Sequence, residues 1–365
     1  MNMNNKSKKK VLVINTARTG LTGMTSVIMN YTQITHSKID YDFVLVGKVD
    51  PITKEELKKI TQNIFLPHVS RTKRPFKYTR WLKRLMAEKK YDAVHVHANS
   101  ATAYFDIHAA KLAGVPIRIC HSHSSFCKYK LVHKILRPLL NREVTSAVAC
   151  SDFAGEWLYS GDFTVLYNGI DVDKYKFSET ARNQYRKELN LGNKFVIGHV
   201  GYLEPLKNHM YLLAVFKKLL KSVPDATLLL VGEGSMRQTI EEYVRENNMQ
   251  NNVMLLGNRS DVAGIYQCMD VLALPSLWEG LPVTLVEGQT SGLPCIVSAT
   301  VTRQADLTGE VSYLEIGEEN INDWVNEFES VNINFESRYE KEEVIKNSAF
   351  NIHNNANTLL KLYGE

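Results

Sequence analysis

Two glutamates lie eight residues apart in the segment LPSLWEGLPVTLVEGQTSGLP, residues 274–294. Glu279 follows an apolar run that predicts a buried strand, and Glu287 lies in the helical pattern that comes next. We expect this helix to begin near Pro282, because proline is favoured in a first helical turn. Neither position needs an acid for folding. Both glutamates are therefore candidates for binding or catalysis, with plain solvated side chains as the alternative.

The turn between the two acids has the properties of a phosphate site. Gly280 would let a ligand approach the backbone closely, and the free amides and dipole of a helix N-terminus favour an anion. The Glu287 carboxylate could accept two hydrogen bonds from the vicinal hydroxyls of a ribose. Glu279 could reach a sugar held over the turn. This arrangement fits a nucleotide-sugar.

Four histidines cluster after two predicted strands, as His95 and His97 in HVH and His121 and His123 in HSH. Residues alternate faces along a strand, so the members of each pair share a face. Two such pairs could supply imidazoles to zinc. No cysteine pair or carboxylate completes a set at metal spacing, however, and we expect no metal and no other cofactor. For His95, simple packing at a sheet end is an equally good interpretation.

Short apolar runs alternate with helical stretches along the whole chain, which predicts parallel sheets covered by helices on both faces. We expect an α/β protein of two facing Rossmann-like, doubly wound domains with a cleft between them. The boundaries predicted are residues 1–168, joined by a C-terminal helix at about 350–365, and residues 169–349. The expected strands are 11–15, 42–47, 93–98, 116–122, 147–150, 195–201, 227–232, 253–257, 271–276, 293–298 and 311–315.

Length and composition agree with this organisation. A chain of 365 residues is too long for one ordinary core. No apolar run reaches the roughly 18 residues of a membrane span, and no signal peptide is evident. The five cysteines are scattered, as reduced thiols in a cytoplasmic protein would be. Residues 1–168 hold 26 Lys/Arg against 12 Asp/Glu, and the remainder holds 18 against 27. This asymmetry points to an anionic partner for the first half.

Several segments occur in the order that one enzyme family uses. They are RICHSHSS, VLYNGIDVDKY, GHVGYLEPLKNH, LLLVGEGS and LLGNRSDVAGIYQCMDVLALPSLWEGLPVTLVEGQTSGLPCIVS. Together they closely resemble retaining family-4 glycosyltransferases, which have the GT-B fold. RICHSHSS and YDAVHVH resemble the subgroup of bacterial capsular and exopolysaccharide clusters. The similarity covers nearly the whole chain.

The resemblance implies roles for individual residues. Lys207 matches the family's lysine, which neutralises the diphosphate leaving group, whereas Tyr202 occupies the position of the family's arginine. A tyrosine hydroxyl donates one neutral hydrogen bond and cannot replace a cation. By the same resemblance, His123 binds the donor sugar, with His121 as the alternate, and His97 faces the acceptor. Further donor-site residues implied by the matching segments are Gly23, Leu281, Pro282, Val283, Asn258 and Arg259.

A basic segment, SRTKRPFKYTRWLKRLMAEKK (70–90), carries nine Lys/Arg and one acid, with Phe76, Tyr78 and Trp81 interleaved. A second basic and apolar stretch is KYKLVHKILRPLLNR (128–142). Basic residues and interfacial aromatics suit an anionic membrane surface. We expect contact with the inner face of the cell membrane. A solvated helix is the main alternative, and nucleic acid is not expected because no such motif accompanies the charge.

The sequence therefore predicts a retaining glycosyltransferase. It would move a hexose or N-acetylhexosamine from a UDP-sugar donor to a lipid-linked or oligosaccharide acceptor in capsular or exopolysaccharide synthesis. Tyr202 keeps open a non-catalytic nucleotide-sugar-binding partner subunit as an alternative. A nucleotide-sugar epimerase of similar two-domain shape is a further alternative, and it would change the donor without an acceptor.

Overall fold

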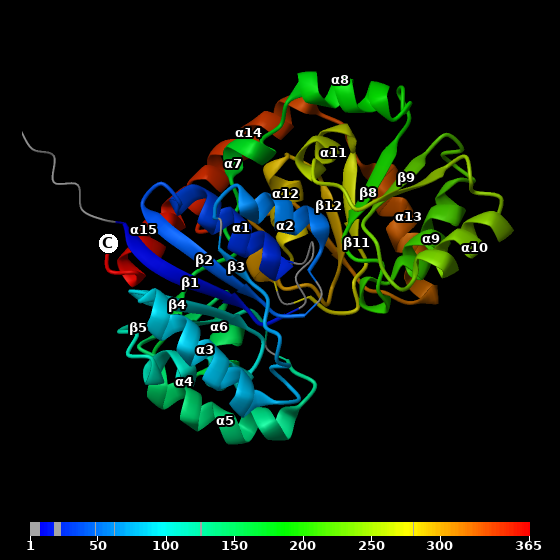
Figure 1. Cartoon of the computed structure of the whole chain (residues 1–365). Helices are drawn as coiled ribbons and strands as arrows, with labels where there is room; N and C mark the ends of the chain where they lie inside the picture. The colour runs from blue at the N-terminus through cyan, green and yellow to red at the C-terminus, as the bar shows by residue number, and fades with distance from the viewer. Residues whose placement is uncertain (1–7, 18–22, 48, 62, 125, 280) are drawn as a thin grey trace, which may run out of the picture. The chain divides into compact units, whose positions relative to one another are not determined.

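The computed structural model describes residues 8–17, 23–47, 49–61, 63–124, 126–279 and 281–365 (Figure 1). They divide into two compact units. The N-terminal unit runs to Gly169 and includes Ile352–Glu365, and the C-terminal unit is Ile170–Asn351. The division thus lies one residue from the predicted one at 168/169, and the last helix belongs with the first unit.

The N-terminal unit has a parallel sheet whose seven described strands are ordered β3-β2-β1-β4-β5-β6-β7. The order reverses between β1 and β4, which makes this the switch point where open α/β sheets bind ligands. The strands are β1 (Lys9–Asn15), β2 (Ile39–Leu45), β3 (Ile64–Phe65), β4 (Ala93–Ala98), β5 (Ile117–Ser122), β6 (Ser146–Ala149) and β7 (Thr164–Val165).

Helices connect these strands and cover the sheet. They are α1 (Gly23–Thr35), α2 (Pro51–Lys58), α3 (Pro75–Lys89), η1 (Ala101–Ala103), α4 (Tyr104–Leu112), α5 (Lys130–Glu143), α6 (Asp152–Leu158) and the C-terminal α15 (Ile352–Leu362). Helix α15 packs against α1. Gly169 is needed for this packing, because a Cβ at that position would lie 3.0 Å from the Ile352 Cα.

The C-terminal unit has a second parallel sheet, ordered β10-β9-β8-β11-β12-β13 in the described residues. Its switch point lies between β8 and β11. The strands are β8 (Val196–Val200), β9 (Thr227–Val231), β10 (Val253–Gly257), β11 (Val271–Leu274), β12 (Cys295–Ser298) and β13 (Val311–Leu314).

The helices of this unit again alternate with the strands. They are α7 (Val172–Tyr175), α8 (Glu179–Glu188), η2 (Pro205–Lys207), α9 (His209–Leu219), α10 (Arg237–Glu246), α11 (Val262–Cys268), α12 (Val283–Thr290), η3 (Arg303–Ala305), η4 (Glu318–Asn320), α13 (Ile321–Ser330) and α14 (Phe335–Lys346). One core cluster lies between the sheet and α9, α10 and α13, and Trp324 is its largest fully buried side chain.

The predicted α/β class with two Rossmann-like parallel-sheet domains is confirmed, and every predicted strand is present. The sequence did not predict β3 and β7, two edge strands of two residues each. Such short segments carry no periodicity that a pattern could reveal. Among the described residues, no helix combines the length and apolarity needed to cross a bilayer.

Candidate functional site

Lys207 and Glu279 meet at the switch point of the C-terminal sheet. Lys207 ends η2, which follows β8, and Glu279 comes after the adjacent strand β11. The lysine Nζ forms an ion pair with Glu279 Oε1, and Ser276 Oγ donates a hydrogen bond of 2.8 Å to the same oxygen. Only 18% of the Lys207 side chain and 13% of the Glu279 side chain are exposed. A cation and an acid that lie far apart in the sequence thus form one partly buried pair.

The helix that follows Glu279 has an N-terminus without a side-chain cap among the described residues. Helix α12 begins at Val283 with Pro282 at its N-cap, and no side chain of the described residues caps it. The first amides of any helix have no partner within the helix, so they remain available to an anion. Leu281 and Val283 lie at this end, and their donor role remains a prediction. Gly280, the turn glycine between them and Glu279, lies outside the described residues.

Glu287 lies in the second turn of α12 and is almost fully buried. Its Oε1 accepts a hydrogen bond of 2.8 Å from the Tyr175 hydroxyl, and its Oε2 accepts one of 2.9 Å from the Tyr266 hydroxyl. Burial raises the pKa of Glu287, and the two tyrosine hydroxyls oppose this shift. Each carboxylate oxygen has a second lone pair, so Glu287 retains the capacity to accept bonds from a ligand.

Sequence reasoning missed the two tyrosines. Tyr175 is the last residue of the short helix α7, and Tyr266 lies in α11. Both tyrosines lie far from Glu287 along the chain, so no regular spacing between them and the glutamate could be recognised in the sequence. The signal that could have pointed to Tyr175 is its place in VLYNGIDVDKY, one of the segments that resemble the family.

The structure does not bring Asn258 and Arg259 to the Lys207–Glu279 pair. Both follow β10, which is separated from β8 by β9 at the edge of the sheet. Asn258 is exposed, and Arg259 forms ion pairs of 2.6 Å with Asp261 and 3.4 Å with Glu188. Their predicted donor role remains a prediction. The same holds for Gly23, the exposed first residue of α1 in the other unit.

The four histidines form one stacked cluster at the carboxyl ends of β4 and β5. His95 Nε2 lies 3.3 Å from His121 Nδ1, and His97 Nδ1 lies 2.8 Å from His123 Nε2. The rings of His95 and His97 stack with centroids 4.1 Å apart, and those of His121 and His123 are tilted with centroids 4.2 Å apart. Tyr363, in the turn directly after α15, bonds His95 Nδ1 at 2.7 Å. The C-terminal segment thus fixes one end of the cluster.

The cluster differs in exposure from one histidine to the next. His95, His97 and His121 are buried, whereas His123 is half-buried. One nitrogen from each of the three buried rings lies within 4.8 Å of the others, which would allow a metal ion after the rings reorient. In the present arrangement the close nitrogens of each histidine pair bond one another. The geometry describes a hydrogen-bonded cluster of neutral rings.

Acid is expected to destabilise the protein through this cluster. Burial lowers the pKa of His95 and of His123 to about 3, and it lowers those of His97 and His121 well below the usual value. Because the unfolded chain protonates near pH 6.5, stability is complete above that pH and falls as the pH drops toward 3. Each histidine lowers the free energy of unfolding by about 1.4 kcal/mol for each pH unit in this range.

Denaturant titration at pH 7.5 and pH 5.5 measures this effect. The free energy of unfolding should fall by several kcal/mol for the four rings together. His121→Leu should reduce the difference between the two pH values by about 1.4 kcal/mol, and His36→Ala, which changes an exposed histidine, should not. Equal stability at both pH values would contradict the buried neutral cluster.

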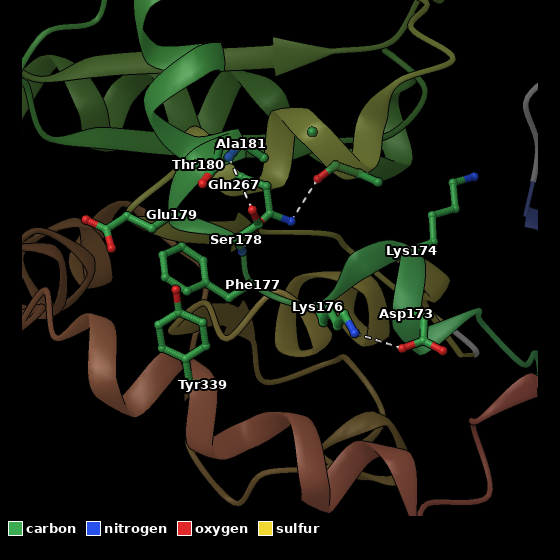
Figure 2. A pocket seen from close by; sticks show the side chains of 12 residues that line it. Asp173, Lys174, Lys176, Phe177, Ser178, Glu179, Thr180, Ala181, Gln267 and Tyr339 are labelled. Carbon is green, nitrogen blue, oxygen red and sulfur yellow. Dashed lines mark hydrogen bonds and ion pairs between the residues drawn. The ribbon is translucent and has the colours of Figure 1, made fainter.

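The C-terminal unit also has a surface hollow where α7 leads into α8 (Figure 2). Phe177, Ser178, Gln267 and Tyr339 are among its lining residues. The Gln267 side chain accepts a bond from the Ser178 amide and donates to the Tyr175 carbonyl. None of the predicted site residues lines this hollow. The hydrogen bonds of Gln267, which lines the hollow, fix the segment that carries Tyr175, and the Tyr175 hydroxyl in turn bonds Glu287.

Comparison with known proteins gives a consistent result. Residues 181–347 match the family described as glycosyl transferases group 1, and residues 39–174 match glycosyltransferase family 4. A Bacillus subtilis protein named as a glycosyltransferase, EpsF, is 32% identical over 333 residues, which cover 86% of this chain and 85% of that protein. An Escherichia coli UDP-Gal:alpha-D-GlcNAc-diphosphoundecaprenol alpha-1,3-galactosyltransferase is 34% identical over 60% of each chain.

Solved structures agree on the fold. HepE of Anabaena, solved in complex with UDP and glucose, has a TM-score of 0.77 at 18% identity and covers 98% of this chain and 99% of its own. TarM of S. aureus, a mutant solved with UDP among its ligands, has a TM-score of 0.74 at 11% identity and covers 98% of this chain and 100% of its own. At these identities the likeness concerns the fold alone.

Proposed function

This chain belongs to the family-4 glycosyltransferases of GT-B fold, and from that premise we propose that it transfers a hexose or N-acetylhexosamine from a UDP-sugar to a lipid-linked saccharide. Two findings support the choice of substrates. The E. coli relative is named for a UDP-galactose donor and a diphosphoundecaprenol-linked acceptor. The HepE structures hold UDP or UDP-glucose. Cell-surface polysaccharide synthesis is the corresponding biological role.

The observation that carries the proposal is the Lys207–Glu279 pair beside the uncapped N-terminus of α12. A diphosphate placed there would meet the Lys207 ammonium and the first amides of α12. Glu279 would then be free to accept bonds from hydroxyls of the transferred sugar. Glu287, one turn further along α12, would hold the ribose.

These groups account for the chemistry by positioning and charge. The bond between the sugar C1 and the diphosphate oxygen breaks, and its electron pair leaves with the diphosphate, whose charge Lys207 and the amides stabilise. The acceptor hydroxyl oxygen bonds C1 on the same face, and its proton passes to the departing phosphate oxygen. Retention of configuration follows from this front-face route. The positive charge comes from the protein, so we expect transfer to persist in the presence of EDTA.

The histidine cluster has a role on both the transferred sugar and the acceptor in this proposal. His123, the half-buried member, would contact the donor sugar, and His97, which bonds it, would orient it and face the acceptor. His121 is fully buried, so it would act on the acceptor through the rings that it contacts. All four rings are neutral at physiological pH, and His123, the one that is not fully buried, could accept a hydrogen bond from a sugar hydroxyl.

Two assays test the proposed function. A thermal-shift screen of UDP-, GDP- and dTDP-sugars should show stabilisation by UDP-sugars, and the donor found should then give a new glycosidic bond on a lipid-diphosphate saccharide. An altered free nucleotide-sugar without an acceptor would indicate an epimerase. Donor binding without transfer or slow hydrolysis would indicate a binding subunit, which is the alternative that Tyr202 favours.

We further propose that the enzyme docks on the anionic membrane surface, and the structure changes which segment we assign to this contact. In α3, Tyr78 is fully buried and bonds Asp106, and Trp81 packs against the core. Tyr78 is therefore unavailable to a membrane, and Trp81 is partly buried against the core and the His68 ring. Of the three aromatics of the segment 70–90, Phe76 remains exposed.

Helix α5 and the residues before it present the better surface. Leu131 is 72% exposed and Ile135 is 59% exposed, and Phe126 and Tyr129 are exposed beside them. Lys128, Lys130 and Lys134 are interleaved with these apolar side chains and are also exposed. An amphipathic helix with apolar residues between lysines fits the headgroup region of an anionic bilayer. We propose this α5 surface as the docking face.

Changing the apolar residues of the α5 surface should release the protein from membranes. Leu131→Ser/Ile135→Ser should weaken binding to phosphatidylglycerol vesicles about 10-fold or more, because two partly inserted side chains are lost. Co-sedimentation measures the effect, with phosphatidylcholine vesicles as the uncharged comparison. Val344→Ser, at an exposed apolar site of the other unit, is the matched control. Unchanged sedimentation of the double variant would contradict the assignment.

A further inference from the structure

A second pair of histidines lies beside Lys207 in the C-terminal unit. His199 lies in β8, and His209 is the first residue of α9, two residues after Lys207. Their rings pack edge to face with centroids 4.4 Å apart. His199 is fully buried and His209 is 2% exposed. We propose that His209, supported by His199, is a diphosphate-binding residue that supplies a second hydrogen-bond donor next to Lys207. This inference rests on the proposed function and assigns a residue to it.

Both ring nitrogens of His209 are buried, and neither has a hydrogen-bond partner within the described parts of the chain. His199 Nδ1 bonds the Ala273 carbonyl at 2.8 Å, but its Nε2 is also unpartnered there. A buried polar group without a partner costs about 1–3 kcal/mol, and an apolar ring of the same shape would avoid that cost. Packing therefore does not explain two imidazoles at this position. His199 already donates its Nδ1–H to the Ala273 carbonyl, so the N–H that a ligand could accept is that of His209.

The surroundings of His209 favour an anion. Helix α9 begins at His209, its N-cap residue Asn208 is in the left-handed conformation at φ 55°, and no described side chain caps this end. The helix dipole and the first amides, which have no partner within the helix, favour an anion at the end where His209 lies. Burial and the nearby Lys207 charge lower the pKa of His209 to about 4. A neutral imidazole can donate one N–H without repelling the lysine.

Lys207 and the histidine pair converge over Gly201. A Cβ on Gly201 would lie 3.3 Å from the Lys207 Cε and 3.5 Å from the His199 Nε2. The lysine side chain and His199 therefore both lie close to Gly201, and His209 packs against His199. In the ligand-free arrangement Lys207 is paired with Glu279, so one lysine serves both an acid and a diphosphate. Tyr202, next to Gly201, offers a neutral hydroxyl. A hydrogen bond from His209 would add a second donor for the diphosphate, which Lys207 alone would otherwise bind.

The test compares two substitutions that differ in their hydrogen-bonding groups. His209→Phe keeps a ring against His199 but has no donor, and His209→Asn keeps an N–H donor in a smaller side chain. Calorimetry with UDP at pH 7.5 should show about 10-fold weaker binding to H209F than to wild type, and a smaller loss for H209N. The melting temperature of H209F should equal or exceed that of wild type, because an unsatisfied buried polar group has been removed.

A third variant supplies a donor from another position. Tyr202→Arg in the H209F background should restore most of the UDP affinity, while the same change in wild type should gain little. Equal UDP affinity of wild type and H209F would overturn the proposal. A loss of UDP affinity in H209F that is accompanied by a lower melting temperature would also overturn it. So would a loss of affinity that Tyr202→Arg does not restore. If wild type itself does not bind UDP, the proposed function fails, and that outcome is distinct from failure of the His209 assignment.

Discussion

Replacing Glu279 with glutamine is expected to lower turnover by about 100-fold or more while UDP affinity stays equal to that of wild type or rises. Two physical effects produce this split. The carboxylate that would accept bonds from the transferred sugar is lost, so the transition state is less stabilised. At the same time Lys207 loses its partner and becomes available to the diphosphate, because the two groups form an ion pair in the ligand-free arrangement.

Steady-state transfer with the identified UDP-sugar gives the turnover, and calorimetry with UDP gives the affinity. Ser276→Ala is the matched comparison, because it removes the hydroxyl that bonds Glu279 Oε1 and retains the carboxylate. It should have a much smaller effect on turnover. A fall in UDP affinity as large as the fall in turnover would place Glu279 on the nucleotide and contradict its assignment to the sugar.

The second large effect is expected for Lys207→Met, which should lower both the affinity for UDP and the turnover of the transfer reaction. The loss of a charged hydrogen bond to the diphosphate should weaken UDP binding about 10- to 100-fold. The loss of charge stabilisation on the leaving group should lower turnover about 100- to 1000-fold. The methionine retains most of the lysine's aliphatic length over Gly201, which keeps the packing of the loop.

The control is Lys217→Met, at an exposed lysine of α9 that lies away from the pair. The double variant Lys207→Met/Glu279→Gln should bind UDP as weakly as Lys207→Met alone, because releasing a lysine matters only when the lysine is present. Additive effects of the two substitutions on UDP binding would show that the ion pair does not govern the availability of Lys207.

The sequence predicted those parts of the molecule that depend on local patterns. The strands of both sheets came from apolar runs, and the division near residue 169 came from a turn signal and the change of strand series. Glu279 was found because it follows a predicted strand, and ligands of open α/β sheets bind after strands at the switch point. Lys207 was found because its segment resembles the family. The structure adds that β8 and β11, which carry them, are neighbours at that point.

Contacts between distant segments could not be predicted from one sequence. Tyr175 and Tyr266 hold Glu287 from two other helices, 112 and 21 residues away along the chain. The diagonal pairing of the four histidines depends on the register of β4 and β5. The aromatic residues of the basic segment 70–90 were expected to face a membrane. Tyr78 is instead buried and bonds Asp106 of α4. Each of these results from tertiary packing, which local periodicity does not record.

A crystal structure with bound UDP is the measurement that tests the central claim most directly. The account predicts the diphosphate on Lys207 and on the first amides of α12, and the ribose hydroxyls on Glu287. It also predicts that the Lys207–Glu279 ion pair opens when the ligand is bound. UDP bound away from the β8–β11 switch point, or bound there with Lys207 still paired to Glu279 and Glu287 without a ribose contact, would contradict it.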